Sequence, residues 1–219
     1  MGKKGDATKA AIRNTALHLF IRKGFKDVTM KDICEAAGLS RGGLYMHYGS
    51  TGQIFADIIN EFMSGLENDI AEKMENGQSA TVILDELLER YQSEMLDRSG
   101  SLGLAFYEYY SSIPLSDDNA MLKQYYISKA MLCSLIKYGI SKGEFRQVNI
   151  NAVVDLLLFS YQGVRMLSSI MPLDDDAIPA GMIRQIREIL IKSKRLGGKM
   201  DEIKDCRKRR NVSNSKSIL

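Results

Sequence analysis

Residues 29–48 constrain the fold of this chain most, because they combine a helix start, a glycine stop and a second helix start in one short stretch. Thr29, followed by Asp32 at the third position after it, is a capping-box pair that begins a helix. Gly38 can end that helix in a left-handed conformation, and Ser40 can cap the next one. The stretch therefore predicts two short helices joined by a tight turn.

Apolar residues in the same stretch predict how these two helices meet. Ile33 and Ala37 are separated by one helical turn, which gives the first helix a single buried face. Leu39 and Leu44 remain to fill the angle between the helices. Such a pair is a helix-turn-helix, which presents its second helix to the major groove of DNA. A helical hairpin with polar decoration and no DNA contact is the alternative.

The second helix has an unusual first turn that favours DNA contact. Arg41 is followed by Gly42 and Gly43, and each Gly costs about 1 kcal/mol relative to Ala in a helix interior, somewhat less near its end. A helix that must approach phosphates and base edges gains clearance and accessible backbone N–H groups from them. Arg41, Tyr45 and His47 then offer a guanidinium group, a phenol and an imidazole along the exposed side.

This stretch and its flanks resemble the N-terminal domain of the TetR family of transcriptional regulators, over about residues 10–55. The residues that carry the resemblance are Leu19, Phe20, Gly24, Phe25, Val28, Thr29, Asp32, Ile33, Ala37, Gly38, Leu39, Ser40, Gly42, Leu44, Tyr45, His47 and Tyr48. The resemblance implies an all-helical homodimer that binds an operator in double-stranded DNA. It also implies release of that operator when a small-molecule effector enters the C-terminal domain.

The resemblance assigns Thr29, Tyr45 and His47 to phosphate or base contacts, and Arg41 is our candidate for the base edges. Where the family usually has a phosphate-binding Lys, this chain has Thr51, which could donate one hydrogen bond without charge. Ser50 with Gln53 preserves the capping box at that helix start. The candidate DNA contacts are Thr29, Ser40, Arg41, Gly42, Gly43, Tyr45, His47 and Thr51.

Charge is distributed unevenly along the 219 residues, although the formal net charge is only +3. Residues 1–48 carry a net charge of +5, residues 49–195 a net charge of −6, and residues 196–219 a net charge of +4. A basic N-terminal segment beside an acidic body is typical of a DNA reader joined to a domain that stays off DNA. We expect a DNA-binding domain at 1–50, a ligand-binding and dimerisation domain at 51–195, and a basic flexible tail at 196–219.

Apolar periodicity predicts an all-α fold with no sheet: an N-terminal three-helix DNA-binding domain followed by a C-terminal helical domain. A long helix is expected to begin near Thr51, with apolar residues at three- and four-residue steps that could link the two domains. The other expected helices span 7–23, 79–97, 102–112, 116–142, 149–170 and 178–195, and Ser116, Asp117 and Asp118 form the expected start of one of them.

Several functional classes are disfavoured by the sequence. The most apolar stretch, 152–171, contains Asp155, Gln162 and Arg165, so we expect a buried helix and not a membrane span. The three Cys residues are far apart and lack disulfide or metal spacing, which favours a reducing cytoplasm. The two His residues accompany no catalytic triad, metal-ligand pattern or phosphate loop, so we expect no enzyme, no metal and no cofactor.

The expected C-terminal domain is rich in Met and aromatic residues, which favours an adaptable ligand cavity, although any single one of them could simply be core. Glu108 lies within an aromatic run, where it could bind a lipophilic cation or could be an ordinary solvated side chain. The candidate ligand contacts are Phe106, Tyr107, Glu108, Tyr110, Tyr126, Met131, Tyr161 and Met166.

The last two expected helices are apolar enough to pack against a second copy as a four-helix bundle, or to lie wholly within one core. A dimer is favoured because one recognition helix reads too few bases for useful specificity. The sequence thus predicts a cytoplasmic, homodimeric, TetR-like regulator, most simply a repressor that a small ligand releases from DNA. A ligand-independent DNA-bound structural or adaptor protein on the same fold is the alternative.

Overall fold

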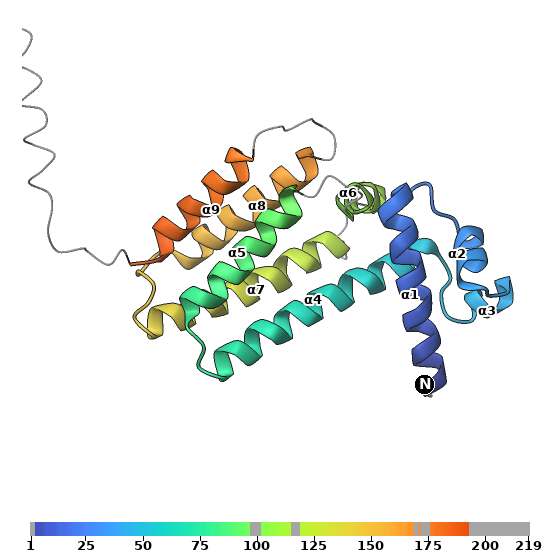
Figure 1. The fold of residues 1–219 in the computed structure, drawn as a ribbon, viewed down its shortest axis with the longest axis horizontal. Coiled ribbons are helices and arrows are strands. Elements are labelled where there is room, and N and C mark those ends of the chain that lie inside the picture. The colour runs from blue at the N-terminus through green and yellow to red at the C-terminus, as the bar shows by residue number, and fades with distance from the viewer. Residues whose placement is uncertain (1–2, 97–101, 115–118, 169–170, 172–175, 193–219) are drawn as a thin grey trace, which may run out of the picture.

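The computed structural model describes residues 3–96, 102–114, 119–168, 171 and 176–192 (Figure 1). Within these ranges the fold is all-α, as predicted, and no described residue belongs to a strand longer than an isolated bridge. The helices are α1 (Lys3–Lys23), α2 (Met30–Ala37), α3 (Arg41–Tyr45), α4 (Thr51–Glu75), α5 (Ala80–Leu96), α6 (Leu102–Ser112), α7 (Ala120–Ser141), α8 (Ile150–Ser168) and α9 (Ala177–Leu190).

Two apolar cores share the long helix α4. One core joins α1, α2, α3 and the first half of α4, where Ile54, Phe55, Ile58 and Ile59 are buried. The other core joins α5, α7, α8 and α9 to the second half of α4, where Ile70 is buried. Figure 1 shows α4 extending from the N-terminal helices along the bundle. Because its apolar residues recur every three or four positions, this single helix contributes to the cores of both parts of the protein.

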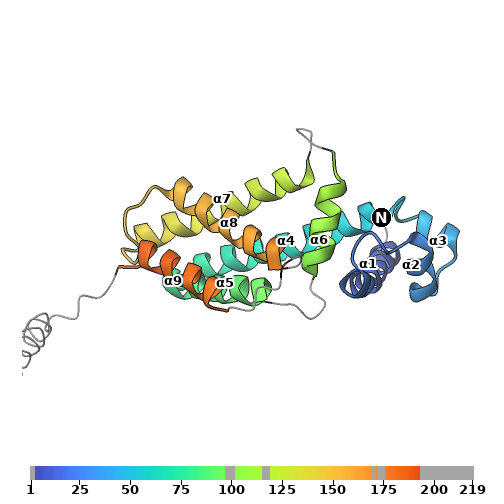
Figure 2. The ribbon, with the colours of Figure 1, turned by 90° about the horizontal axis from the view of Figure 1, so that it is seen from above.

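Helix α6 lies crosswise at the junction of these two parts. Figure 2 shows it running between the bundle and the N-terminal helices, across the direction of the bundle helices. Ala105 and Tyr109 of α6 belong to the N-terminal core, and the Tyr109 ring lies 4.9 Å from that of Phe55, centroid to centroid. Phe25, which follows α1, lies 5.1 Å from the Tyr109 ring. Aromatic packing thus attaches α6 to the N-terminal helices.

Three helix ends differ from the sequence prediction. Helix α1 begins at Lys3, ahead of the expected residue 7. Helix α7 begins after Asn119, whose Oδ1 accepts hydrogen bonds from the backbone N–H groups of Met121 at 2.9 Å and Leu122 at 3.2 Å. The start predicted at 116–118 lies outside the described residues, and the Asn119 cap supplies the physical reason for a later one.

Helix α9 ends at Leu190, before the expected residue 195, because the chain turns extended at Ile191 and pairs with Phe145. The backbone N–H of Arg146 donates to the carbonyl of Leu190 at 2.8 Å, which holds this end against the segment after α7. The predicted tail at 196–219 lies outside the described residues. None of the described helices combines the length and apolarity needed to cross a membrane.

Gly139 in α7 is required by close packing. A Cβ atom at this position would lie 2.2 Å from Cδ2 of Phe145, a ring that is fully buried in the bundle core. Gly139→Ala is therefore expected to lower the free energy of unfolding by about 1–3 kcal/mol, as overpacked cores do. Urea unfolding followed by circular dichroism measures it. Gly65→Ala is the control, because no atom lies within 4 Å of a Cβ there, and equal destabilisation by both variants would contradict the packing argument.

Candidate DNA interface and ligand cavity

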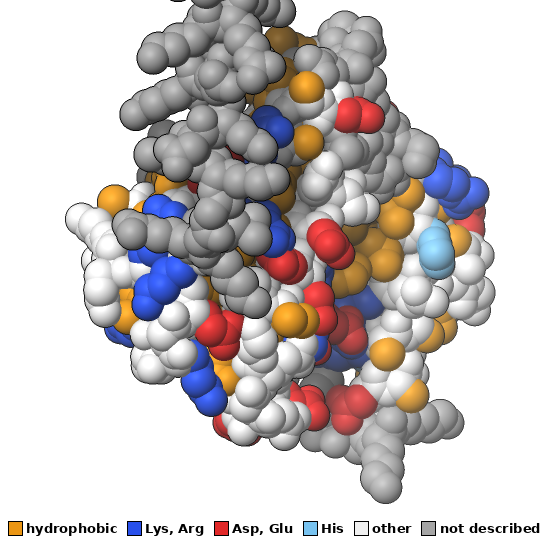
Figure 3. All heavy atoms as spheres, turned by 60° about the vertical axis from the view of Figure 1, so that its left-hand side comes forward, with side chains coloured by type: hydrophobic (Ala, Val, Ile, Leu, Met, Phe, Trp, Pro, Cys, Tyr) orange, Lys and Arg blue, Asp and Glu red, His pale blue; other side chains and the backbone are white. Residues whose placement is uncertain are grey.

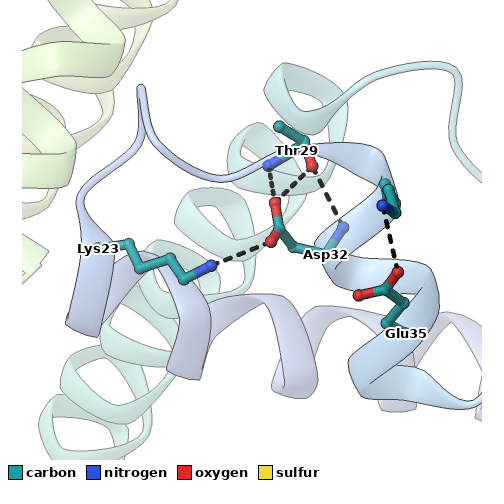
Figure 4. A network of polar contacts seen from close by, with 5 residues as sticks. Lys23, Thr29, Asp32 and Glu35 are labelled. Carbon is teal, nitrogen blue, oxygen red and sulfur yellow. Dashed lines mark hydrogen bonds and ion pairs between the residues drawn. The ribbon is translucent and has the colours of Figure 1, made fainter.

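The start of α2 is fixed by a polar network around Asp32 (Figure 4). The backbone N–H of Thr29 donates to Asp32 Oδ2 at 2.9 Å, and that of Asp32 donates back to Thr29 Oγ1 at 3.2 Å, which completes the predicted capping box. Lys23 Nζ at the end of α1 donates to Asp32 Oδ1 at 3.0 Å. Hydrogen bonds from Thr29, and to a smaller extent from Lys23, hold the pKa of Asp32 below its usual range. The capped helix is thereby attached to α1.

The turn between α2 and α3 has the predicted geometry. Gly38 has a φ of 65°, in the left-handed region, and the N–H of Leu39 donates to the carbonyl of Cys34 at 3.0 Å. Ser40 then caps α3, since its Oγ accepts from the N–H of Gly43 at 3.1 Å. Leu44 is fully buried between the two helices. These residues form a helix-turn-helix in which α3 is the recognition helix.

The outer side of α3 carries the predicted contacts. Arg41 and Gly42 are exposed, and no atom lies within 4 Å of a Cβ at Gly42. Tyr45 follows Arg41 by one helical turn and is 54% exposed. Met46, which the sequence reasoning missed, is 84% exposed beside it and could contact a thymine methyl group. No pattern in the sequence distinguishes this Met from those that are buried.

The remaining predicted DNA contacts surround this helix. Thr29 and Ser40 are exposed at the starts of α2 and α3, whereas Gly43 is half-buried against the Ser40 hydroxyl. His47 is half-buried just beyond α3, and Thr51 is the half-buried first residue of α4. Ser50 caps α4 by accepting from the N–H of Gln53 at 3.2 Å, as predicted. The helix-turn-helix thus gathers the predicted residues at one end of the molecule (Figure 1).

A second polar network joins the segment that follows the recognition helix to α1 and α4. The buried Tyr48 donates its hydroxyl to Asp57 Oδ2 of α4 at 2.9 Å, and Arg13 of α1 donates to the same hydroxyl at 3.4 Å. Arg13 Nε also pairs with Glu61 Oε2 at 2.7 Å. Lys9 lies over the Tyr48 ring, with its Nζ 5.3 Å from the centroid. The end of α3 is therefore held to both α1 and α4.

Acidic side chains mark the surface of the body. Figure 3 shows them over the middle of the face that it turns toward the viewer, in keeping with the negative charge of residues 49–195. Like charge repels the phosphate backbone of DNA, so the net negative charge of this part of the protein disfavours contact with DNA.

A cavity of about 260 Å³ lies between α4, α5, α6, α7 and α8, and Ile21 of α1 also contributes to its wall. Ile59, Phe62, Met63 and Leu66 of α4 form its apolar side. This volume is of the order that small-molecule sites occupy. The cavity is therefore bounded in part by α4 and α6, which also contribute to the N-terminal core.

Part of the cavity wall is polar, and the sequence reasoning missed most of it. Arg90, Glu94, Gln124 and Arg165 line it together with Tyr161. Arg90 Nε donates to Glu94 Oε1 at 2.8 Å, and the Tyr161 hydroxyl donates to Glu94 Oε2. Arg165 donates to the Tyr161 oxygen at 3.1 Å. The one-turn spacings of Arg90 with Glu94 and of Tyr161 with Arg165 were the available signal for this wall.

Of the predicted ligand contacts, Phe106, Tyr110 and Tyr161 line this cavity. Five others do not line it, namely Tyr107, Glu108, Tyr126, Met131 and Met166. Met131 is buried in the bundle core, and Tyr126 is 59% exposed on the surface of α7. The physical reason is helix geometry, because only one face of each helix can reach the cavity.

Glu108 neither lines the cavity, where it could bind a cation, nor is simply a solvated side chain, the two roles that the sequence suggested. It lies on the side of α6 away from Phe106 and Tyr110, and its Oε2 accepts from the backbone N–H groups of Phe25 at 2.7 Å and Lys26 at 3.0 Å. Gly24, with a φ of 79°, allows this approach, since a Cβ there would lie 2.7 Å from the same oxygen. The carboxylate thus fastens α6 to the loop between α1 and α2.

Glu108→Ala is expected to lower the free energy of unfolding by about 1–3 kcal/mol, because it leaves the N–H groups of Phe25 and Lys26 without their acceptor. Chemical denaturation gives the stability, and amide hydrogen exchange at these two residues reports the local effect. Glu108→Gln retains an acceptor oxygen and should lose distinctly less. Unchanged exchange at Phe25 in the Ala variant would contradict the assignment.

Comparisons with known proteins agree with this geometry. The model of the family described as "Bacterial regulatory proteins, tetR family" matches residues 12–58. An uncharacterized HTH-type transcriptional regulator of Bacillus subtilis, YfiR, is 30% identical over 147 residues, which is 65% of this chain and 70% of that protein. The HTH-type transcriptional repressor KstR2 of Rhodococcus jostii is 24% identical over 146 residues, 66% of this chain and 70% of the repressor.

A solved structure shares most of the fold. A TetR transcription regulator from Haloarcula marismortui superimposes with a TM-score of 0.67 at 19% identity, over 84% of this chain and 96% of that one. The helix-turn-helix and the helical bundle are thus arranged as in a known fold. The chain belongs to the TetR family, and it is a DNA-binding transcriptional regulator.

Proposed function

We propose that the protein is a homodimeric repressor that binds an inverted-repeat operator and is released from it by a small ligand. The observation that carries this proposal is the cavity of about 260 Å³ lined by α4 and α6. Both helices also pack into the N-terminal core, α4 through Phe55 and α6 through Tyr109. A molecule that fills the cavity therefore contacts two helices that pack into the same core as the helix-turn-helix.

At the operator, we assign the base-edge contact to Arg41, with Gly42 and Gly43 giving clearance. Thr29, Tyr45 and His47 are assigned to phosphates or base edges, and the exposure of Tyr45 supports this role. Ser40 and Thr51 lie at helix starts beside them. In a two-fold dimer the two recognition helices would enter successive major grooves about 34 Å apart, one turn of DNA.

The dimer would form through α8 and α9. Leu156 and Phe159 of α8 are 51% and 68% exposed, and Ile178 of α9 is 43% exposed, although all three are large apolar side chains. Exposed apolar side chains gathered on adjacent helices are typical of an interaction surface. Packing this helix pair against its copy would bury them in a four-helix bundle with closed two-fold symmetry.

Release requires that the ligand prefers a conformation in which the two recognition helices are spread too far apart for the operator. Displacement of α4 or α6 by a filled cavity is a direct way to produce that preference. Two proteins of the same fold were solved with small molecules, a regulator from Saccharomonospora viridis with choline and SmeT with triclosan, at 17% and 15% identity. A relative is also named a repressor, which supports the proposal that this protein represses transcription when it is bound to its operator.

The test is fluorescence anisotropy of the full chain on DNA from upstream of its own gene, with and without a library of amphipathic compounds. We expect protection of an inverted repeat in a footprint and a loss of anisotropy with at least one compound that also binds the free protein. An operator complex that no compound weakens would leave the ligand-independent adaptor as the better interpretation. Failure to bind any inverted repeat would contradict both.

A further inference from the structure

Each carboxylate oxygen that lines the cavity within the described residues already has a partner in the protein. Glu94 is the one acidic side chain that lines the cavity among the described residues, and both of its oxygens are engaged, Oε1 by Arg90 and Oε2 by the Tyr161 hydroxyl. Burial raises the pKa of Tyr161 above its ordinary value, so the phenol stays protonated and continues to donate. A bound ammonium group would have to share this carboxylate with the Arg90 guanidinium, whose like charge repels it.

Hydrogen-bond donors, in contrast, belong to other residues that line the cavity. Gln124 Nε2 is buried and has no hydrogen-bond partner within the described part of the chain. Arg165 also lines the cavity, with its guanidinium carbon 4.4 Å from the centroid of the Phe106 ring. The lining thus contains two guanidinium groups, those of Arg90 and Arg165, against one carboxylate. A buried amide N–H without an acceptor is costly, so an acceptor oxygen on the ligand would relieve that cost.

Much of the rest of the cavity lining is apolar. Ile59, Phe62, Met63 and Leu66 of α4 and Leu158 of α8 supply this apolar part. A ligand that satisfies both sides has an apolar body and one end rich in acceptor oxygens. Charge-assisted hydrogen bonds to such an end are about twice as strong as neutral ones.

We propose that the effector is an anionic amphiphile, an apolar chain or ring system that ends in a carboxylate-like oxyanion, with the oxyanion at Gln124 and Arg165. This inference rests on the proposed ligand cavity and names the chemistry that the cavity selects. It excludes quaternary ammonium compounds and other lipophilic cations as preferred ligands. The apolar body would lie along α4, beside Phe62 and Leu66.

The experiment compares three ligands of equal chain length, decanoate, 1-decanol and decylammonium, by displacement of the neutral fluorophore N-phenyl-1-naphthylamine from the full chain. We expect decanoate to bind about tenfold more tightly than 1-decanol, with decylammonium weakest, because decanoate alone carries the charge opposite to that of Arg165 and decylammonium carries the same charge. Equal affinities, or tighter binding of decylammonium, would overturn the proposal while leaving the cavity and its role intact. If neither the fluorophore nor any of the three ligands binds, the result contradicts the proposal that the cavity is a ligand site, and with it the proposed release from DNA by a ligand.

A variant localises the effect. Gln124→Leu should reduce the preference for decanoate over 1-decanol by about fivefold, since it removes the buried donor and retains the volume. Tyr126→Leu is the matched control, because Tyr126 lies on the same helix and is exposed outside the cavity. A preference that is the same in Gln124→Leu and in the unaltered protein would contradict the assignment of the head group to this end. The ligand series on the unaltered protein decides the proposal even if the variant does not fold.

Discussion

Arg41→Ala is expected to weaken operator binding by about 1–3 kcal/mol, roughly 5- to 150-fold, the range for loss of a bidentate base contact. Arg41 is exposed at the first position of α3, one helical turn before the exposed Tyr45. Its planar guanidinium group can donate two parallel hydrogen bonds to the major-groove edge of a guanine. Anisotropy titrations on the operator and on a scrambled duplex measure the effect, which should be larger on the operator.

The control for Arg41 removes the same charge elsewhere in the N-terminal helices. Arg22 is exposed near the end of α1 that lies toward α6, away from α3 (Figure 1). Arg22→Ala should change affinity for both duplexes little and equally, because only long-range attraction is lost. If Arg41→Ala weakens the scrambled duplex as much as the operator, Arg41 contacts phosphate and not a base edge.

Phe159→Glu is expected to convert the dimer to monomers at micromolar concentration. Phe159 is 68% exposed on α8, where we propose the contact with a second copy, and two-fold symmetry places the change in both chains. Each fully buried Phe contributes about 1.5–3 kcal/mol, and a buried unpaired carboxylate adds a desolvation cost. Operator affinity should then fall by at least about tenfold, since each monomer reads only a half-site.

Sedimentation velocity gives the mass and anisotropy gives the affinity. Val82→Glu is the control, because Val82 is 44% exposed on α5, which is not part of the proposed interface. That variant should keep the dimer mass and the operator affinity. A dimer mass for Phe159→Glu at nanomolar concentration would place the interface elsewhere on the surface.

Local signals made the helix-turn-helix predictable. Thr29 with Asp32, Gly38 and Ser40 act on backbone groups within a few residues, so their geometry follows from the sequence alone. The end of α9 did not follow in this way, because the pairing of Ile191 with Phe145 depends on a segment distant in sequence. The family could likewise be recognised from the sequence, because the residues that carry the resemblance are concentrated in and around the helix-turn-helix.

The cavity was only partly predictable for a related reason. Aromatic composition identified Phe106, Tyr110 and Tyr161, but composition does not say which face of a helix turns inward. The crosswise direction of α6 decides that Phe106 faces the cavity and Glu108 faces the loop after α1, and that direction is set by packing on the N-terminal core and against α8. Arg90 was missed because a charged residue on a helix is ordinarily a solvated one.

The contact between Gly24 and Glu108 has a consequence for how the chain can change over evolutionary time. A side chain at position 24 would meet the Glu108 carboxylate at 2.7 Å and would also need the backbone to leave its φ of 79°. A relative with a larger residue at position 24 therefore needs a shorter side chain at position 108, or one that points elsewhere. A relative without the carboxylate has no steric clash at position 24, although the backbone angle there still favours glycine. We therefore expect the side chain at position 108, on α6, to limit which residues position 24 can accept, ahead of the DNA-reading helices.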